Sequence, residues 1–152
     1  MFEKILLVLL VTWSPVAELR GGIPLGLSLG LDPILTLIIA IVANSILFLP
    51  VFGLLELLYK RFLYKVKIFN SYLEWVKQKK KPWVDKYGFL GLTLFVAIPL
   101  PTSGVYTGTT LSWLLGMDWK RAYLAVGLGV LLAGVVVLLA ALGIITALQT
   151  WL

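Results

Sequence analysis

The chain has no cysteine and no histidine among its 152 residues. Without cysteine, disulfides, thiolate metal sites and cysteine nucleophiles are excluded. Without histidine, the commonest general base and the commonest metal ligand are missing. Only Glu18, Asp32, Asp118 and hydroxyl groups would be left to carry chemistry inside a membrane. We therefore expect no enzyme, no catalytic residue, no metal site and no cofactor.

Charged residues are scarce. They make up 13% of the chain, whereas 61% is hydrophobic and the mean hydropathy is +1.02. A soluble domain carries about 25% charged residues. Three windows have no charge at all, namely residues 33–55, 87–117 and 122–152. Each reaches the roughly 20 apolar residues that a helix needs to cross a bilayer. The composition predicts an all-α integral membrane protein with a single membrane domain over residues 1–152.

The positive charge is concentrated in one segment. Residues 60–86 contain nine lysines and arginines against Glu74 and Asp85, which gives +7; the whole chain is +6, so the rest sums to −1. Nucleic-acid binding is one interpretation of such a cluster. Between membrane segments, however, a basic cluster is typical of a cytoplasmic loop that follows the positive-inside rule. We expect a multi-pass protein of the plasma membrane, with residues 60–86 in the cytoplasm and no nucleic-acid partner.

This basic connector, residues 59–87, has a helical pattern of its own. Apolar side chains recur at steps of four and three residues, at Phe62, Val66, Phe69, Leu73 and Val76. The pattern predicts an amphipathic helix. It would lie on the cytoplasmic leaflet, where each cation near anionic lipid contributes about 1 kcal/mol, or pack on the underside of the protein's own bundle.

An offset of 86 residues aligns two parts of the chain. Six of the 18 positions from 15 to 32 are identical to the position 86 residues later: Pro15, Gly22, Leu25, Leu29, Gly30 and Asp32. In each half, a short apolar run meets a break rich in proline and glycine. A second short apolar run (residues 25–31 in one half, 105–117 in the other), a Gly-x-Asp sequence and a long apolar helix follow. We predict two repeats, residues 1–58 and 88–152, with Asp32 and Asp118 as helix N-caps.

The breaks determine the predicted topology. Pro99 and Pro101 should stop a helix, because proline removes a backbone hydrogen bond and clashes with the preceding turn. If residues 87–117 turn back there, Lys120 and Arg121 stay on the side of the basic connector, as the charge rule favours. In the first half the charges leave open whether residues 5–31 turn back or span. The repeat favours turning back.

Together these features predict an inverted-topology repeat. Each half is a re-entrant helical hairpin followed by a transmembrane helix, and the basic amphipathic helix joins the halves. The hairpins would enter from opposite faces, and their tips would meet near the midplane, where protein or water must cover the non-helical backbone.

Two charges fall at the first predicted tip, residues 15–24. Glu18 and Arg20 are two residues apart, and each charge at the bilayer centre costs about 2.5–3.5 kcal/mol on insertion scales. They would serve function, or would pair with each other or with freed backbone groups. Helix N-termini beside Arg20 would attract an anion. The candidate substrate-binding residues are Glu18, Arg20, Gly21, Gly22, Pro24, Pro99, Pro101, Thr102, Ser103, Gly104 and Tyr106.

Two motifs carry a family resemblance. They are Pro15-x-x-Glu18-x-Arg20-Gly21-Gly22-Ile23-Pro24-Leu25-Gly26 and Ile98-Pro99-Leu100-Pro101-Thr102-Ser103-Gly104. Both resemble the small multidrug export protein family, which is similar to the wider DedA (VTT-domain) superfamily. The resemblance implies two re-entrant loops in inverted repeats, and it links the chain to polyprenyl-phosphate or phospholipid translocation and to proton-dependent drug tolerance. The superfamily's acidic residue and arginine would correspond to Glu18 and Arg20. The second loop here has neither, which weakens the case for coupling by two carboxylates.

The leading interpretation is a small membrane transporter, or a lipid flippase or scramblase. It would move an anionic or amphipathic substrate, such as a lipid phosphate, through a site between the two loops, and Glu18 would gate the site or carry a proton. An uncoupled channel and a non-transporting membrane scaffold are the alternatives. Expected partners are membrane lipids, the substrate, protons and a second copy of the chain. Gly129 and Ala133 would allow close packing in an oligomer, or against a hairpin of the same chain.

Overall fold

The computed structural model of the protein describes residues 1–62, 65–68, 70–71, 74–75, 84–100 and 103–151. In this part of the chain every regular element is helical, as predicted. The elements are α1 (Phe2–Trp13), α2 (Glu18–Ser28), α3 (Pro33–Ile46), α4 (Phe48–Arg61), the π-helical turn η2 (Val84–Gly88), α6 (Phe89–Ala97), α7 (Val105–Leu114) and α8 (Trp119–Trp151).

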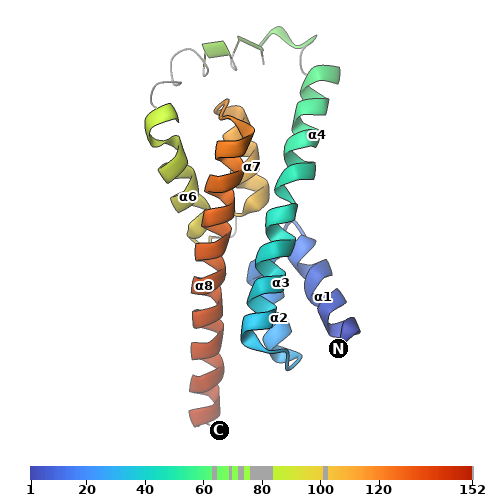
Figure 1. The fold of residues 1–152 in the computed structure, drawn as a ribbon, viewed down its shortest axis with the longest axis vertical. Helices are drawn as coiled ribbons and strands as arrows, with labels where there is room; N and C mark the ends of the chain where they lie inside the picture. Colours follow the sequence, from blue (N-terminus) through green and yellow to red (C-terminus); the bar gives the residue numbers. More distant parts are fainter. Residues whose placement is uncertain (63–64, 69, 72–73, 76–83, 101–102, 152) are drawn as a thin grey trace.

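The first half is a helical hairpin followed by an interrupted rod. Helices α1 and α2 pack against each other, and α3 and α4 follow nearly end to end (Figure 1). The window 33–55 is thus not one uninterrupted helix. Pro50 has no N–H to donate to the carbonyl four residues back. Three residues before Pro50, the Leu47 N–H donates to the Asn44 carbonyl at 3.2 Å. This 3₁₀-type hydrogen bond lies where α3 ends.

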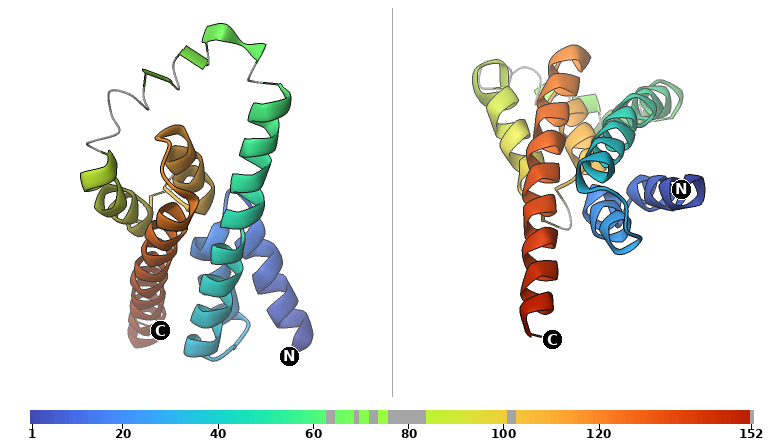
Figure 2. Two further views of the ribbon diagram at one scale, coloured as in Figure 1. Left: turned by 45° about the horizontal axis from the view of Figure 1, so that its top comes forward. Right: turned by 60° about the horizontal axis from the view of Figure 1, so that its bottom comes forward.

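The second half has the same order of elements and runs the other way. Helix α6 descends from the connector end of the molecule to mid-height, α7 returns to that end, and α8 runs the full length (Figure 1). In the first half, α1 runs from the opposite end of the molecule to mid-height, and α2 returns to that end (Figure 1). Both termini lie at that opposite end (Figure 2). The two hairpin breaks therefore meet halfway along the molecule.

The offset of 86 residues recurs in the local geometry. Helix α3 begins at Pro33 and α8 at Trp119, which are 86 residues apart. Gly30 and Gly116, which precede these helices, have φ angles of 72° and 67°, the left-handed conformation that glycine adopts at helix ends without strain. Asp32 caps α3 as predicted, since its Oδ1 accepts from the Leu35 N–H at 2.9 Å. Asp118 Oδ2 accepts from the Lys120 N–H at 3.2 Å.

The buried positions of the two returning helices correspond as well. In α2 these are Glu18, Leu19, Gly22, Ile23 and Gly26. The positions 86 residues later are buried too: Gly104, Val105, Gly108, Thr109 and Ser112. Each half therefore buries the same helical face, and Gly104 is the counterpart of Glu18.

In the part of the chain that the structure describes, two helical stretches are long and apolar enough to cross a membrane. They are Pro33–Arg61 and Trp119–Ala147, with mean hydropathies of 2.5 and 2.9. Only 28% of each apolar window is buried inside the protein. Large side chains such as Leu139, 64% exposed, face outward. A core helix of a soluble protein would bury such groups, because exposed apolar area in water is unfavourable. The prediction of a helical membrane protein is supported.

The core lies where α8 meets α6 and the hairpin tips. Its fully buried apolar side chains include Ile23 of α2, Val96 of α6, and Val126 and Val130 of α8. Gly129 lets α6 approach closely, because a Cβ there would lie 2.8 Å from the Thr93 carbonyl oxygen. The small-residue face of α8 is thus used within the chain.

Three of the five apolar positions that predict the amphipathic connector helix lie outside the described residues: Phe69, Leu73 and Val76. Phe62 and Val66 are described and exposed. The Tyr59 hydroxyl donates to Asn70 Oδ1 at 2.7 Å, which ties the connector to the end of α4. The connector helix stays a prediction.

Candidate functional site

Two hydrogen bonds join the hairpin breaks. Arg20 Nη2 donates to Ser103 Oγ at 3.0 Å, and the Tyr106 hydroxyl donates to the Trp13 carbonyl at 2.6 Å. The partners are 83 and 93 residues apart in the sequence. The fold thus brings together residues that the sequence placed at two separate tips.

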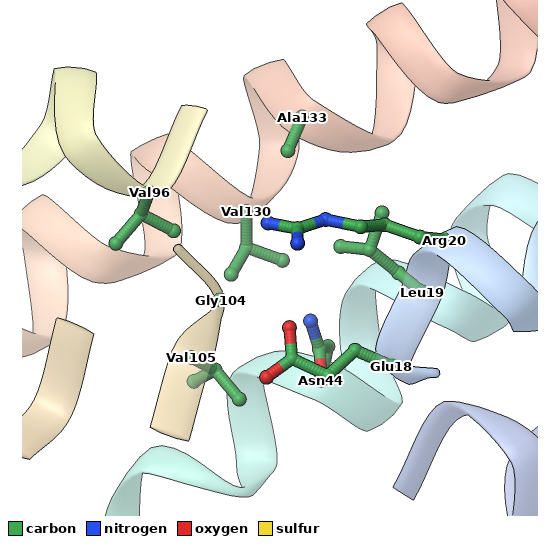
Figure 3. A pocket seen from close by; sticks show the side chains of 9 residues that line it. All are labelled: Glu18, Leu19, Arg20, Asn44, Val96, Gly104, Val105, Val130 and Ala133. Carbon is green, nitrogen blue, oxygen red and sulfur yellow. The ribbon is translucent and has the colours of Figure 1, made fainter. Parts of the chain in front are cut away.

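Glu18 occupies the centre of this region in an unusual conformation. It is the first residue of α2 and only 6% exposed. Its φ of +49° is the only positive value at a non-glycine residue in the described chain. An L-residue with a side chain rarely adopts this conformation, which costs about 1–3 kcal/mol. The carboxylate lies beside the first N–H groups of α7, those of Val105 and Tyr106. Figure 3 shows it next to Gly104 and Val105.

Gly104 provides the room for that carboxylate. A Cβ atom built on Gly104 would overlap the carboxyl group of Glu18. The φ of Gly104 is −98°, which any residue can adopt, so the requirement for glycine here is one of space. The side chain of Glu18 therefore fills the position that its repeat counterpart leaves empty.

Asn44 completes the polar cluster, and the sequence analysis did not single it out. It is fully buried near the end of α3 and lies beside the Glu18 carboxylate (Figure 3). Within the described residues, neither of its amide atoms makes a hydrogen bond of normal geometry. A buried polar group without a partner usually costs about 1–3 kcal/mol. The signal in the sequence was an asparagine inside the uncharged window 33–55.

Arg20 and Ser103 form the other side of the cluster. Arg20 extends from α2 toward Val130 and Ala133 of α8 (Figure 3). Ser103 Oγ accepts from Arg20 and from the Leu100 N–H at 3.1 Å, and it donates to the Ile98 carbonyl. One hydroxyl has one proton and two lone pairs, so Ser103 is fully used in holding the second break against Arg20.

The space between these side chains is filled. It is lined by Glu18, Arg20, Asn44, Gly104 and neighbouring apolar groups, and it has no volume for a water-sized sphere. A bound molecule would need these groups to separate.

Arg20 also borders an open apolar groove beside α8, with a volume of about 290 Å³. The other lining residues are Pro24, Pro99, Val136, Val137, Ala140, Ala141 and Ile144. Except for Arg20, every side chain in this lining is apolar. The groove therefore combines one cation with a hydrocarbon-like wall, and the predicted residues Pro24 and Pro99 lie in it.

Gly21 and Gly22 lie apart from the polar cluster. The second apolar run was expected to begin at Leu25, but α2 already begins at Glu18 and contains both glycines and Pro24. A Cβ on Gly22 would overlap the Thr12 hydroxyl of α1, and one on Gly21 would lie 3.1 Å from Val11 Cγ1 of α1. These glycines let α1 and α2 pack closely. Pro101 and Thr102 lie outside the described residues.

The fold and this cluster define a small helical membrane protein with a polar site between two helical breaks. Residues 18–136 match the family described as "Putative small multi-drug export protein". The match covers about three quarters of the chain, so the chain belongs to this family, whose description names a transporter-like function. Comparison with curated proteins and with solved structures gives no match.

Proposed function

We propose that this protein is a small membrane transporter of the flippase or scramblase type, which moves an amphipathic anion such as a lipid phosphate. The observation that carries the proposal is the buried carboxyl group of Glu18 with the partly buried Arg20 two residues along α2, between two hairpin tips halfway along the molecule. Charges at membrane depth are costly and usually mark a transport path.

The short helices support a re-entrant topology. Helix α1 has 12 residues and α6 has nine, so at 1.5 Å per residue they reach about 18 and 14 Å. The hydrocarbon layer is about 30 Å thick. We propose that the α1–α2 and α6–α7 hairpins enter from opposite faces, and that α3–α4 and α8 cross. This inverted arrangement, with repeats 1–58 and 88–152, is also what a relation to the DedA superfamily implies.

The distribution of cations supports an orientation. Lys60, Arg61 and Lys86 lie at the connector end of the molecule, as do Lys120 and Arg121 at the start of α8. Lys4 is near the opposite end. By the positive-inside rule, the connector is cytoplasmic in a plasma membrane and both termini are outside.

The chemistry of the site favours an anion. A guanidinium, the N-terminus of α7 and polar side chains converge there, and helix N-termini attract negative charge. Glu18 is the group we propose to gate the site or to carry a proton.

The groove supports a lipid over a soluble drug. Its volume of about 290 Å³ is near the lower end of ligand pockets, which begin at about 300 Å³. An anionic group at Arg20 would leave its hydrocarbon chain against Val137, Ala140 and Ile144 of α8. Two crossing stretches provide little protein to enclose a wide aqueous path, whereas a groove open to lipid needs less.

The test is lipid transfer between leaflets of vesicles that contain the purified protein. A fluorescent phosphatidylglycerol in the inner leaflet is protected from dithionite until it is moved outward. We expect the chain to accelerate its loss, and Arg20→Ala to slow it about tenfold or more, because a charged hydrogen bond is lost. Lys60→Ala, on the exposed end of α4, should retain the full rate.

Other outcomes would argue against this site or for a different function. Full transfer by Arg20→Ala would contradict the proposed site. A steady ion current without lipid transfer would indicate the channel. No transfer by the wild-type chain, with loss of a cellular phenotype only when Lys77, Lys79, Lys80 and Lys81 are neutralised, would indicate the scaffold.

A further inference from the structure

The N-terminus of α7 already holds an anion, and that anion belongs to the protein. The Glu18 carboxylate lies beside the N–H groups of Val105 and Tyr106, which are among those left without partners inside the helix. Arg20 lies on the same side of the tip, two residues along α2. This is the arrangement of an oxyanion site, filled from within the chain.

Asn44 points independently to a ligand. It is fully buried, it borders the same filled space, and its amide lacks a hydrogen bond of normal geometry among the described residues. Because the Asn44 amide makes no such bond while Glu18 fills the site, it is available to an oxyanion of a different shape. Tetrahedral phosphate presents more acceptor oxygens than a carboxylate does.

We propose that Glu18 is an internal ligand of this oxyanion site and that the anionic group of the substrate takes its place. The inference rests on the proposed function only for the identity of the displacing anion. The two anions exclude each other, because the space holds not even a water-sized sphere while Glu18 is in place. The carboxylate occupies the space that Gly104 leaves open.

The backbone of Glu18 favours its release. A φ of +49° at a residue with a side chain is held only by its surroundings. When the carboxylate leaves the α7 N-terminus, that constraint is removed. In the structure Arg20 is bonded to Ser103. It also lines the groove, so it can bind an anion that arrives from there.

The first test is rescue by a small carboxylate. Glu18→Ala empties the site, so formate should raise the unfolding temperature of the purified variant in detergent, in a saturable manner. Sodium chloride at the same ionic strength should not. The wild-type chain, whose site is filled, and Glu56→Ala, an exposed acid on α4, should show no saturable shift. Adding Arg20→Ala to Glu18→Ala should abolish it. No formate response from folded Glu18→Ala, or an equal response from the wild type, would overturn the proposal.

The second test uses Glu18→Gln, which keeps the shape of the side chain and removes the competing charge. Native mass spectrometry of protein from mixed phosphatidylglycerol and phosphatidylcholine vesicles measures the lipid retained. We expect about tenfold tighter retention of phosphatidylglycerol than in the wild type. Equal or weaker retention would overturn the proposal. If Arg20→Ala retains as much phosphatidylglycerol as the wild type, the proposed function fails instead.

Discussion

At the scale of single residues, a side chain of one half occupies the space that a glycine of the other half leaves open. Glu18 and Gly104 are equivalent positions of the repeat, and the carboxyl group of one lies where a side chain of the other would be. Substitutions at Glu18 and at Gly104 should therefore have non-additive effects on the free energy of unfolding, unlike substitutions at distant sites.

Gly104→Ala should destabilise the protein by about 1–3 kcal/mol, the usual cost of overpacking a filled site. In a Glu18→Ala background the new methyl group meets no carboxylate, so the same change should cost less than about 1 kcal/mol. Denaturant unfolding in detergent of the wild type, both single variants and the double variant measures the coupling. Simple additivity of the two changes would show that the carboxylate does not lie against Gly104.

The sequence located this residue cluster only in part. Glu18 and Arg20 were found because charges are rare in an apolar chain. Asn44 was missed, because a single uncharged polar residue hardly changes the hydropathy of its window. Gly21 and Gly22 were interpreted as part of an anion site, but their lack of side chains serves the packing of α1 on α2. A glycine pattern alone does not show whether a ligand or another helix packs against the glycines.

At the scale of helices, the most informative contact is that between α6 and α8. Gly129 faces the Thr93 carbonyl and Val96, with 2.6 Å between its hypothetical Cβ and that of Val96. Gly127, two residues earlier on the same helix, has nothing within 4 Å of such an atom.

Gly129→Ala should therefore destabilise the fold by about 1–3 kcal/mol, whereas Gly127→Ala should stabilise it slightly, by up to about 1 kcal/mol, because alanine favours a helix. Thermal unfolding of the two variants in the same detergent compares them directly. If both glycines respond alike, α6 does not pack on this face of α8.

Helix boundaries were predictable where local chemistry fixes them. Asp32-Pro33 begins α3, and Gly30 precedes it, as the Gly-x-Asp pattern indicated. Pro24 was expected to lie in a break, yet it lies inside α2. The interruption at Leu47 was not predicted, because an apolar window shows how long a hydrophobic segment is and not whether its helix is continuous. Pro50 was the residue in the sequence that could have indicated it.

At the scale of the whole molecule, we propose that two hairpins enter a membrane from opposite faces and hold an anion site between their tips. Composition alone predicted a helical membrane protein, and the family match agrees with it. The repeat led us to expect that the two tips meet. The individual contacts between them, such as the bond from Arg20 to Ser103 83 positions away, could not be read from the sequence, because no local pattern encodes them.

The accessibility of single cysteines tests this claim most directly, since the natural chain has none. Phe2→Cys and Ser28→Cys mark the two ends of the α1–α2 hairpin, and Lys86→Cys and Lys120→Cys mark those of the α6–α7 hairpin; all four side chains are exposed. With an impermeant maleimide on intact cells, we expect the first pair to react from outside, and the second pair to react only after the membrane is opened. Labelling of Phe2→Cys and Ser28→Cys from opposite sides, or of Lys86→Cys and Lys120→Cys from opposite sides, would make that hairpin a crossing and would contradict the proposed topology.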